Sequence, residues 1–217
     1  MAEITYHEPL TGHDEFDSLI ADFADESDPQ KAEEIRQRIW DRFGTEGAVF
    51  ISDMASFSST SRKMGVCHFL KMIHRTRQIV APVIDANHGL LLKCEADNCY
   101  AYFKSADDAI RACFEVNAAL YEANGSFNLG EQINLSVGID YGRVLLIGDV
   151  EFFGDPVNTA SKLGEDLATR NEVLVTHRAI EHSNLEIPEL AERMVARISE
   201  IEIQYVRLPM TEQSSGR

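Results

Sequence analysis

Hydrophobic and polar positions along this chain alternate between a period typical of helices and one typical of strands. The helical spacing predicts helices over residues 28–43, 65–86, 105–124 and 156–168, and short helical pieces near the end of the chain. Apolar runs predict strands at residues 47–52, 90–94, 98–103, 133–140, 144–148, 172–176 and 201–207. Two of the links are short: a hairpin turn around Glu95-Ala96-Asp97 and a turn at Tyr141-Gly142-Arg143.

The order strand–helix–strand–strand–helix–strand is that of a ferredoxin-like palm. We therefore predict an α+β fold with a mostly antiparallel central sheet flanked by helices. Residues 1–46 are predicted to be an acidic N-terminal segment with one helix, residues 47–209 one catalytic domain, and residues 210–217 a frayed tail.

Composition narrows the possible partners. The net charge of −16 argues against nucleic acid or an anionic membrane surface as a partner, because both require a basic face. No apolar run approaches the ~20 residues that span a bilayer, and the N-terminus lacks the basic start and apolar stretch of a signal peptide. We expect a cytoplasmic protein without membrane contact. Cys94 and Cys99 lie in strand-like sequence and are expected to be buried or half-buried free thiols rather than metal ligands.

Two carboxylates occupy the exposed ends of apolar runs. Asp53 follows one predicted strand, and Asp97 lies at the hairpin turn. Each has a simpler explanation, since Asp53 can cap a helix that begins near Ala55 and Asp97-Asn98 can merely form a turn. If the two strands pair, however, both side chains can meet, and two carboxylates with substrate phosphates suffice to hold Mg²⁺.

Three stretches together resemble the active-site signature of the class III nucleotidyl cyclases, which convert a nucleoside triphosphate to a cyclic nucleotide and pyrophosphate. They are residues 51–58 (ISDMASFS), 93–103 (KCEADNCYAYF) and 151–162 (EFFGDPVNTASK). The resemblance spans residues 47–176 and agrees with the predicted palm fold. It implies a two-metal reaction in which the ribose 3′-hydroxyl attacks the α-phosphate.

The resemblance assigns roles to individual residues. Asp53, Asp97 and the main-chain carbonyl of Met54 would hold two divalent ions, Mg²⁺ or Mn²⁺. Phe57 and Ser58 would lie in the loop where main-chain N–H groups meet the phosphates.

Base recognition would fall to Lys93 and Glu151, which complement adenine better than guanine because lysine only donates and a carboxylate only accepts. This pattern favours ATP as the substrate. The plain alternatives are a strand-end lysine and a loop-surface acid.

Asn158 and Lys162, four residues apart on one predicted helix, match the positions that orient the ribose and stabilise the transition state. Arg143 matches a position that contacts the triphosphate, although an exposed turn arginine is its plain alternative. Arg197 corresponds weakly to a further phosphate-binding cation, because the Lys-Gly-Lys pattern of the family is missing.

Four departures from the family pattern leave alternatives open. Ala96 replaces a glycine, Glu151 an aspartate and Lys162 an arginine, and the C-terminal cation motif is eroded. A degenerate domain that binds nucleotide or serves as a regulatory dimerisation module is one alternative, and a guanylate cyclase is another. The family also implies a homodimer in which each active site combines residues of both chains.

Overall fold

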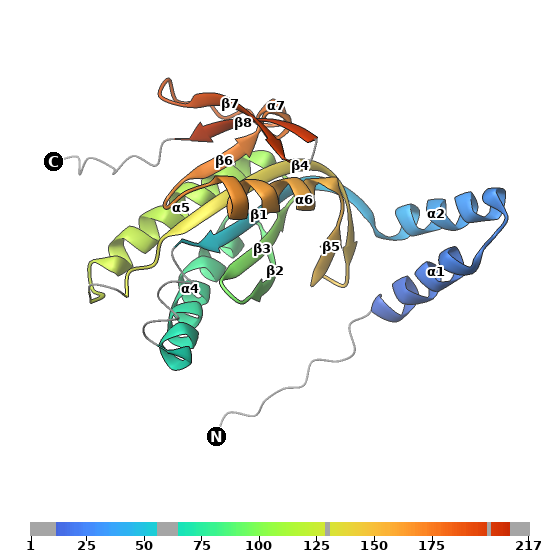
Figure 1. Cartoon of the computed structure of the whole chain (residues 1–217), viewed down its shortest axis with the longest axis horizontal. Helices are drawn as coiled ribbons and strands as arrows, with labels where there is room; N and C mark the ends of the chain where they lie inside the picture. The colour runs from blue at the N-terminus through green and yellow to red at the C-terminus, as the bar shows by residue number, and fades with distance from the viewer. Residues whose placement is uncertain (1–11, 56–64, 129–130, 199–200, 209–217) are drawn as a thin grey trace.

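The computed structural model describes residues 12–55, 65–128, 131–198 and 201–208. Its centre is an eight-stranded sheet of order β2-β3-β1-β4-β6-β8-β7, with β5 paired to β4 (Figure 1). The strands are β1 (Gly44–Met54), β2 (Leu90–Glu95), β3 (Asn98–Phe103), β4 (Leu135–Ile147), β5 (Glu151–Phe153), β6 (Val173–Thr176), β7 (Glu192–Ile198) and β8 (Ile201–Leu208). The helices are α1 (His13–Asp25), α2 (Pro29–Phe43), α4 (Val66–Ala86), α5 (Ala106–Asn124), α6 (Asp155–Ser161), the π-helix η1 (Lys162–Leu167) and α7 (His177–Glu181).

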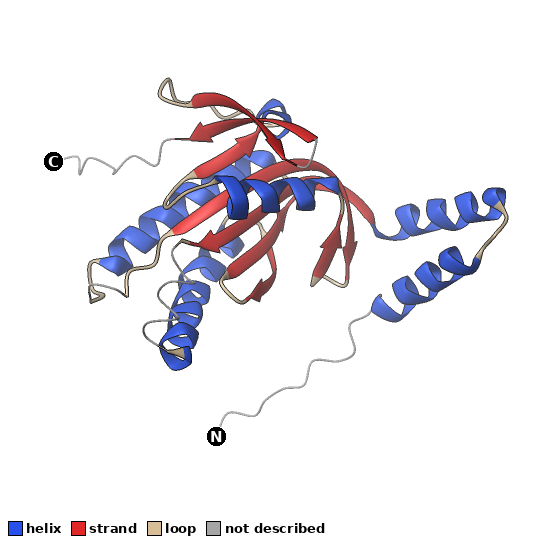
Figure 2. Cartoon of the chain, in the orientation of Figure 1, coloured by secondary structure: helices blue, strands red, loops and turns tan. Residues whose placement is uncertain are grey.

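The predicted fold class is confirmed: the strands pair antiparallel except β4 with β6, and helices cover the sheet (Figure 2). The position of strand β1 within the sheet explains why its sequence is continuously apolar. Ala48 and Phe50 face the core beneath α4 and α5, whereas Val49 and Ile51 pack with α6 and β5 on the other face. Because successive side chains of a strand point to opposite faces, a strand covered on both sides needs apolar residues throughout.

The predicted turn at Tyr141-Gly142-Arg143 is wrong. These residues continue strand β4, which pairs with β1 without interruption from Gly44↔Leu145 to Met54↔Leu135. A glycine inside an apolar run resembles a turn in sequence, but it also occurs in strands where the backbone needs an unusual conformation. Gly142 has φ 154° and lies opposite Gly47 in the ladder.

The N-terminal segment contains two helices where the sequence predicted one. Asp28 caps α2 as expected, accepting hydrogen bonds from the N–H groups of Gln30 and Lys31. The preceding helix α1 packs against α2 through Phe16, whose ring centroid lies 5.3 Å from that of Phe43. The many acidic residues of this stretch obscure its helical period in the sequence. Strand β1 also begins earlier than predicted, at Gly44.

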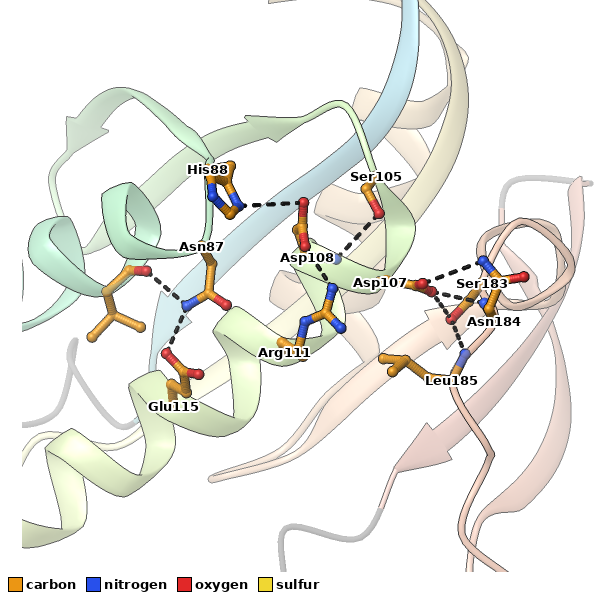
Figure 3. Close-up of polar contacts among 11 residues, drawn as sticks. Asn87, His88, Ser105, Asp107, Asp108, Arg111, Glu115, Ser183, Asn184 and Leu185 are labelled. Atoms are coloured by element: carbon orange, nitrogen blue, oxygen red, sulfur yellow. Dashed lines mark hydrogen bonds and ion pairs between the residues drawn. The ribbon is translucent and has the colours of Figure 1, made fainter.

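The C-terminal part differs in detail from the sequence-based expectation. Strand β7 was not predicted, and the helix expected over residues 156–168 is a short α-helix that continues as η1. Figure 3 shows how the carboxylate of Asp107 near the start of α5 accepts bonds from Ser183 Oγ (2.6 Å) and Asn184 N (2.8 Å). This contact anchors the segment after α7 to α5. The tail predicted at 210–217 lies outside the described residues.

None of the helices in the described ranges is long and apolar enough to cross a bilayer.

Candidate functional site

The two candidate metal-binding aspartates lie together. Strand β3 pairs with β1 so that Cys99 is opposite Ser52, which places the β2–β3 turn beside the residue that follows Ser52. The two carboxyl groups lie close enough for the negative charge of Asp97 to raise the pKa of Asp53. The pairing of strands on which the sequence argument depends is therefore present, and it brings the two carboxyl groups within range of each other's charge.

The environment raises the pKa of Asp53 to about 6. Partial burial is the largest cause, because it penalises the charged form, and the negative charge of Asp97 and its hydrogen bond follow. Glu165 adds a further negative charge, whereas the N–H of Met54 donates to Asp53 and acts in the opposite direction. Two neighbouring ionised carboxylates repel each other. A bound cation would offset this repulsion, which contributes to the raised pKa of Asp53.

Glu165 is a site residue that the sequence analysis missed. It lies on η1, and its Oε1 accepts a hydrogen bond of 2.9 Å from Nδ2 of Asn98, the residue after Asp97. Its charge also acts on Asp53. Close packing allows this approach: a Cβ on Gly164 would lie 2.8 Å from the carbonyl oxygen of Ile51. In the sequence, the one sign of Glu165 as a site residue was the Gly164-Glu165 pair shortly after Lys162. No periodicity predicts a π-helix.

The donor set fits a hard divalent cation. Asp53 and Asp97 supply carboxylate oxygens, and Met54, the last residue of β1, supplies a main-chain carbonyl beside them. Among the described residues, no three His, Cys, Asp or Glu side chains form a metal-binding group. Two carboxylates and a carbonyl would suffice for magnesium if substrate phosphates completed its coordination.

Lys93 and Glu151 form an ion pair, although they belong to different strands of the sheet. Lys93 Nζ on β2 lies 2.8 Å from Glu151 Oε1 on β5, and the side chains are 32% and 31% exposed. The bond to Glu151 raises the pKa of Lys93. The lysine also lies 5.2 Å from the ring centroid of Tyr100. The two candidate base-binding residues thus form one polar group next to an aromatic ring.

Asn158 and Lys162 lie one helical turn apart, since the N–H of Lys162 bonds to the carbonyl oxygen of Asn158. Asn158 is exposed and Lys162 half-buried. Within the described part of the chain, neither side chain has a hydrogen bond or ion pair to another residue. Both groups are therefore available to a ligand.

The other candidate cations lie elsewhere in the single chain. Arg143 is opposite Glu46 at the start of β1, and its Cζ lies 4.5 Å from the ring centroid of Trp40. Arg197 is on β7, the strand at the opposite edge of the sheet from β2. One chain does not bring either arginine to Asp53. Phe57 and Ser58 lie outside the described residues.

Comparison with known proteins places this geometry in a family. The family model of the adenylate and guanylate cyclase catalytic domain matches residues 44–207. A curated relative, "Putative adenylate cyclase 3" of Rhizobium meliloti (strain 1021), is 24% identical over 144 residues, which cover 66% of this chain. The chain spans only 23% of that relative's length.

Solved structures show the same fold at low identity. The guanylyl cyclase Cya2 has a TM-score of 0.67 and 17% identity, covering 79% of this chain and 96% of that one. The guanylate cyclase domain of RhGC from Catenaria anguillulae, solved with GTP, has a TM-score of 0.64 and 17% identity, covering 76% of this chain and 97% of that one. At such identities the likeness concerns the fold alone.

Proposed function

Because the chain belongs to the adenylate and guanylate cyclase catalytic domain family, we propose that it is an adenylate cyclase, which converts ATP to 3′,5′-cyclic AMP and pyrophosphate. The observation that carries the proposal is the register of β1 and β3, which sets Cys99 opposite Ser52 and so brings the turn with Asp97 beside Asp53. A domain kept only for regulation has no need to hold two repelling carboxylates side by side.

Asp53, Asp97 and the Met54 carbonyl would hold two divalent ions, Mg²⁺ or Mn²⁺. When bound, such ions lower the pKa of an attacking hydroxyl and offset the charge of the triphosphate. The residues of this chain hold these oxygen atoms in position. The ladder between β1 and β3 fixes Asp53 relative to the hairpin, and Glu165 holds Asn98 at the turn beside Asp97.

The preference for ATP rests on Lys93 and Glu151. Adenine presents a ring nitrogen that accepts a hydrogen bond and an exocyclic amine that donates one, and an ammonium with a carboxylate matches that pattern. Their ion pair of 2.8 Å orients both groups before the base arrives. A guanylate cyclase would need the reversed pattern.

Asn158 orients the ribose, and Lys162 stabilises the charge that develops on the transferring phosphoryl group. Lysine provides charge without the two-pronged geometry of arginine, so we expect slower catalysis than an arginine would allow.

The working unit is a homodimer in which one chain supplies Asp53 and Asp97 and its partner supplies Lys93, Glu151, Asn158 and Lys162. No hydrogen bond or ion pair within the described ranges joins either aspartate directly to those four residues. Arg143 and Arg197, which lie far from Asp53 within one chain, would reach the triphosphate from the partner.

The test is a product assay. The full chain is incubated with ATP or GTP and Mg²⁺ or Mn²⁺, and both cyclic nucleotides are quantified by chromatography. We expect cyclic AMP from ATP, a loss of at least ~100-fold in Asp53→Ala, and unchanged rates in Asp22→Ala, an exposed carboxylate on α1. Nucleotide binding without turnover would favour the regulatory module instead, and cyclic GMP as the main product would favour a guanylate cyclase.

A further inference from the structure

Two thiols face each other across the β2–β3 hairpin whose turn carries Asp97. Cys94 and Cys99 are directly opposite in the strand register, and their Sγ atoms lie 2.8 Å apart. Residues opposite each other in an antiparallel pair have Cα atoms about 4.5–5.5 Å apart, which lies within the ~4.4–6.8 Å that disulfides span. The backbone is therefore already arranged for a bond between these two sulfur atoms.

We propose that Cys94 and Cys99 are a modification site at which a small-molecule disulfide oxidises the pair to a reversible intramolecular disulfide. The bond would close a ring over residues 94–99, and Asp97 lies within this ring. The oxidation state would thus set how firmly the turn is held. An effect of the disulfide on catalysis rests on the proposed function. Formation of the disulfide between Cys94 and Cys99 does not.

The two thiols have unequal access. Cys94 is partly exposed and Cys99 only 2% exposed, so an oxidant reaches Cys94 first. Arg77 on α4 lies beside it, because its Nη2 donates to the Cys94 carbonyl oxygen at 3.0 Å. The contact with Cys99, with help from Arg77, lowers the pKa of Cys94 to about 7. A partly exposed thiol beside a cation is the usual setting of a reactive cysteine.

The reaction with oxidised glutathione balances in two steps. The Cys94 thiolate attacks one sulfur of the glutathione disulfide, whose S–S bond breaks and releases one glutathione thiolate. Cys99 then loses its proton and attacks Cys94 Sγ, which breaks the mixed disulfide and releases the second glutathione. The two protein thiols are oxidised, and their two electrons and two protons pass to the two glutathione thiolates, which leave as two molecules of reduced glutathione.

The test uses the full chain with Cys67→Ser, which removes the exposed cysteine on α4 and leaves three of the four thiols. After incubation with oxidised glutathione, we expect denatured protein to retain one thiol, with a mass lower by two hydrogen atoms and no bound glutathione. Reduction with dithiothreitol should restore all three. Retention of three thiols, or a stable glutathione adduct on Cys94, would overturn the proposal.

Two single variants in the same background test the order of events. Cys99→Ser should accumulate a glutathione adduct at Cys94, because no second thiol resolves it. Cys94→Ser should stay reduced, because Cys99 is shielded. Rapid glutathione addition to Cys99 would contradict the assigned order.

Thermal unfolding provides a readout that needs neither metal nor nucleotide. Closing so small a ring should raise the Tm of the oxidised protein by roughly 4–8 °C, an effect absent in Cys94→Ser. This result does not depend on whether the protein is a cyclase. An unchanged or lower Tm in fully oxidised protein would show that the native hairpin does not accommodate the bond.

Discussion

Asn98 donates a hydrogen bond of 2.9 Å to Glu165, and this bond connects the hairpin turn to the π-helix η1. Because Asn98 follows Asp97, the contact holds the turn on which a candidate metal ligand lies. It also places a third negative charge near Asp53. Glu165 therefore has two separable effects on the site, one through geometry and one through charge.

Substitutions at Glu165 should separate these effects. Glu165→Gln keeps an acceptor for Asn98 but removes the charge, so the pKa of Asp53 should fall while cyclase activity stays within about threefold. Glu165→Ala also removes the hydrogen bond, and the loss of about 1 kcal/mol of positioning should lower kcat by roughly fivefold. Carboxyl resonances followed by NMR across pH report the first effect, and initial rates report the second.

Asp166→Asn serves as the control, because Asp166 is exposed and neighbours Glu165 in the chain. A pKa of Asp53 that does not change in Glu165→Gln would show that the charge of Glu165 does not reach it.

The raised pKa of Asp53 predicts how the stability of the metal-free protein depends on pH. The folded pKa is about 6, above the ~3.9 of an unfolded aspartate, so the folded state binds this proton more tightly. The free energy of unfolding should therefore fall as pH rises from about 4 to about 6 and stay lower above that. Solvent screening at this partly exposed side chain limits the effect to the order of 1 kcal/mol.

Asp53→Asn should remove this dependence. In urea titrations with EDTA, the variant should be more stable than the parent at pH 8 and similar to it at pH 4. When millimolar Mn²⁺ replaces EDTA, the difference in stability between variant and parent at pH 8 should become smaller, because Mn²⁺ stabilises only the protein that binds it. A parent protein that gains stability between pH 4 and 6 through this residue would contradict the assigned environment.

Shared active sites predict recovery of activity on mixing two inactive variants. Asp53→Ala lacks a metal ligand and Asn158→Ala lacks the ribose contact, so each homodimer should be inactive. Random exchange of subunits makes half of the dimers mixed, each with one intact site, and the mixture should regain about a quarter of the parent activity. Steady-state rates after subunit exchange measure this.

A mixture of Asp53→Ala with Asp97→Ala is the matched control, since both changes affect the same half of the site. It should remain inactive. Equal rates in both mixtures would argue against sites shared between chains.

Nucleotide choice should change with the Lys93 and Glu151 pair. Replacing both with the residues found in guanylyl members of the family, Lys93→Glu with Glu151→Cys, should lower kcat/KM for ATP relative to GTP by about 10²–10³-fold. The physical reason is that a donor and an acceptor covered by a base whose edges do not match them lose hydrogen bonds to water without replacing them.

Glu95→Gln is a suitable comparison, because Glu95 lies 3.6 Å from Lys93 but is largely exposed. It should leave the ratio nearly unchanged. A double variant with unaltered preference for ATP would show that other residues select the base.

The fold and the family can be predicted from the sequence because both depend on patterns among residues that are near one another in the chain. Apolar runs identified β1 and the β2–β3 hairpin, and Asp28 marked the start of α2. It failed where one local pattern has two structural meanings. Gly142 resembled a turn residue but lies within β4, and the acidic residues of α1 concealed its helical period.

By itself, the order of residues determined the alternation of strands and helices, the family motifs and the placement of Asp53 and Asp97 at the ends of apolar runs. Only the tertiary structure decided that these carboxyls lie within range of each other's charge, that Glu165 approaches them from η1, and that the sulfurs of Cys94 and Cys99 face each other. The reason is physical. Propensity and periodicity act over a few neighbouring residues, whereas such contacts depend on strand register and on how closely a helix packs on the sheet.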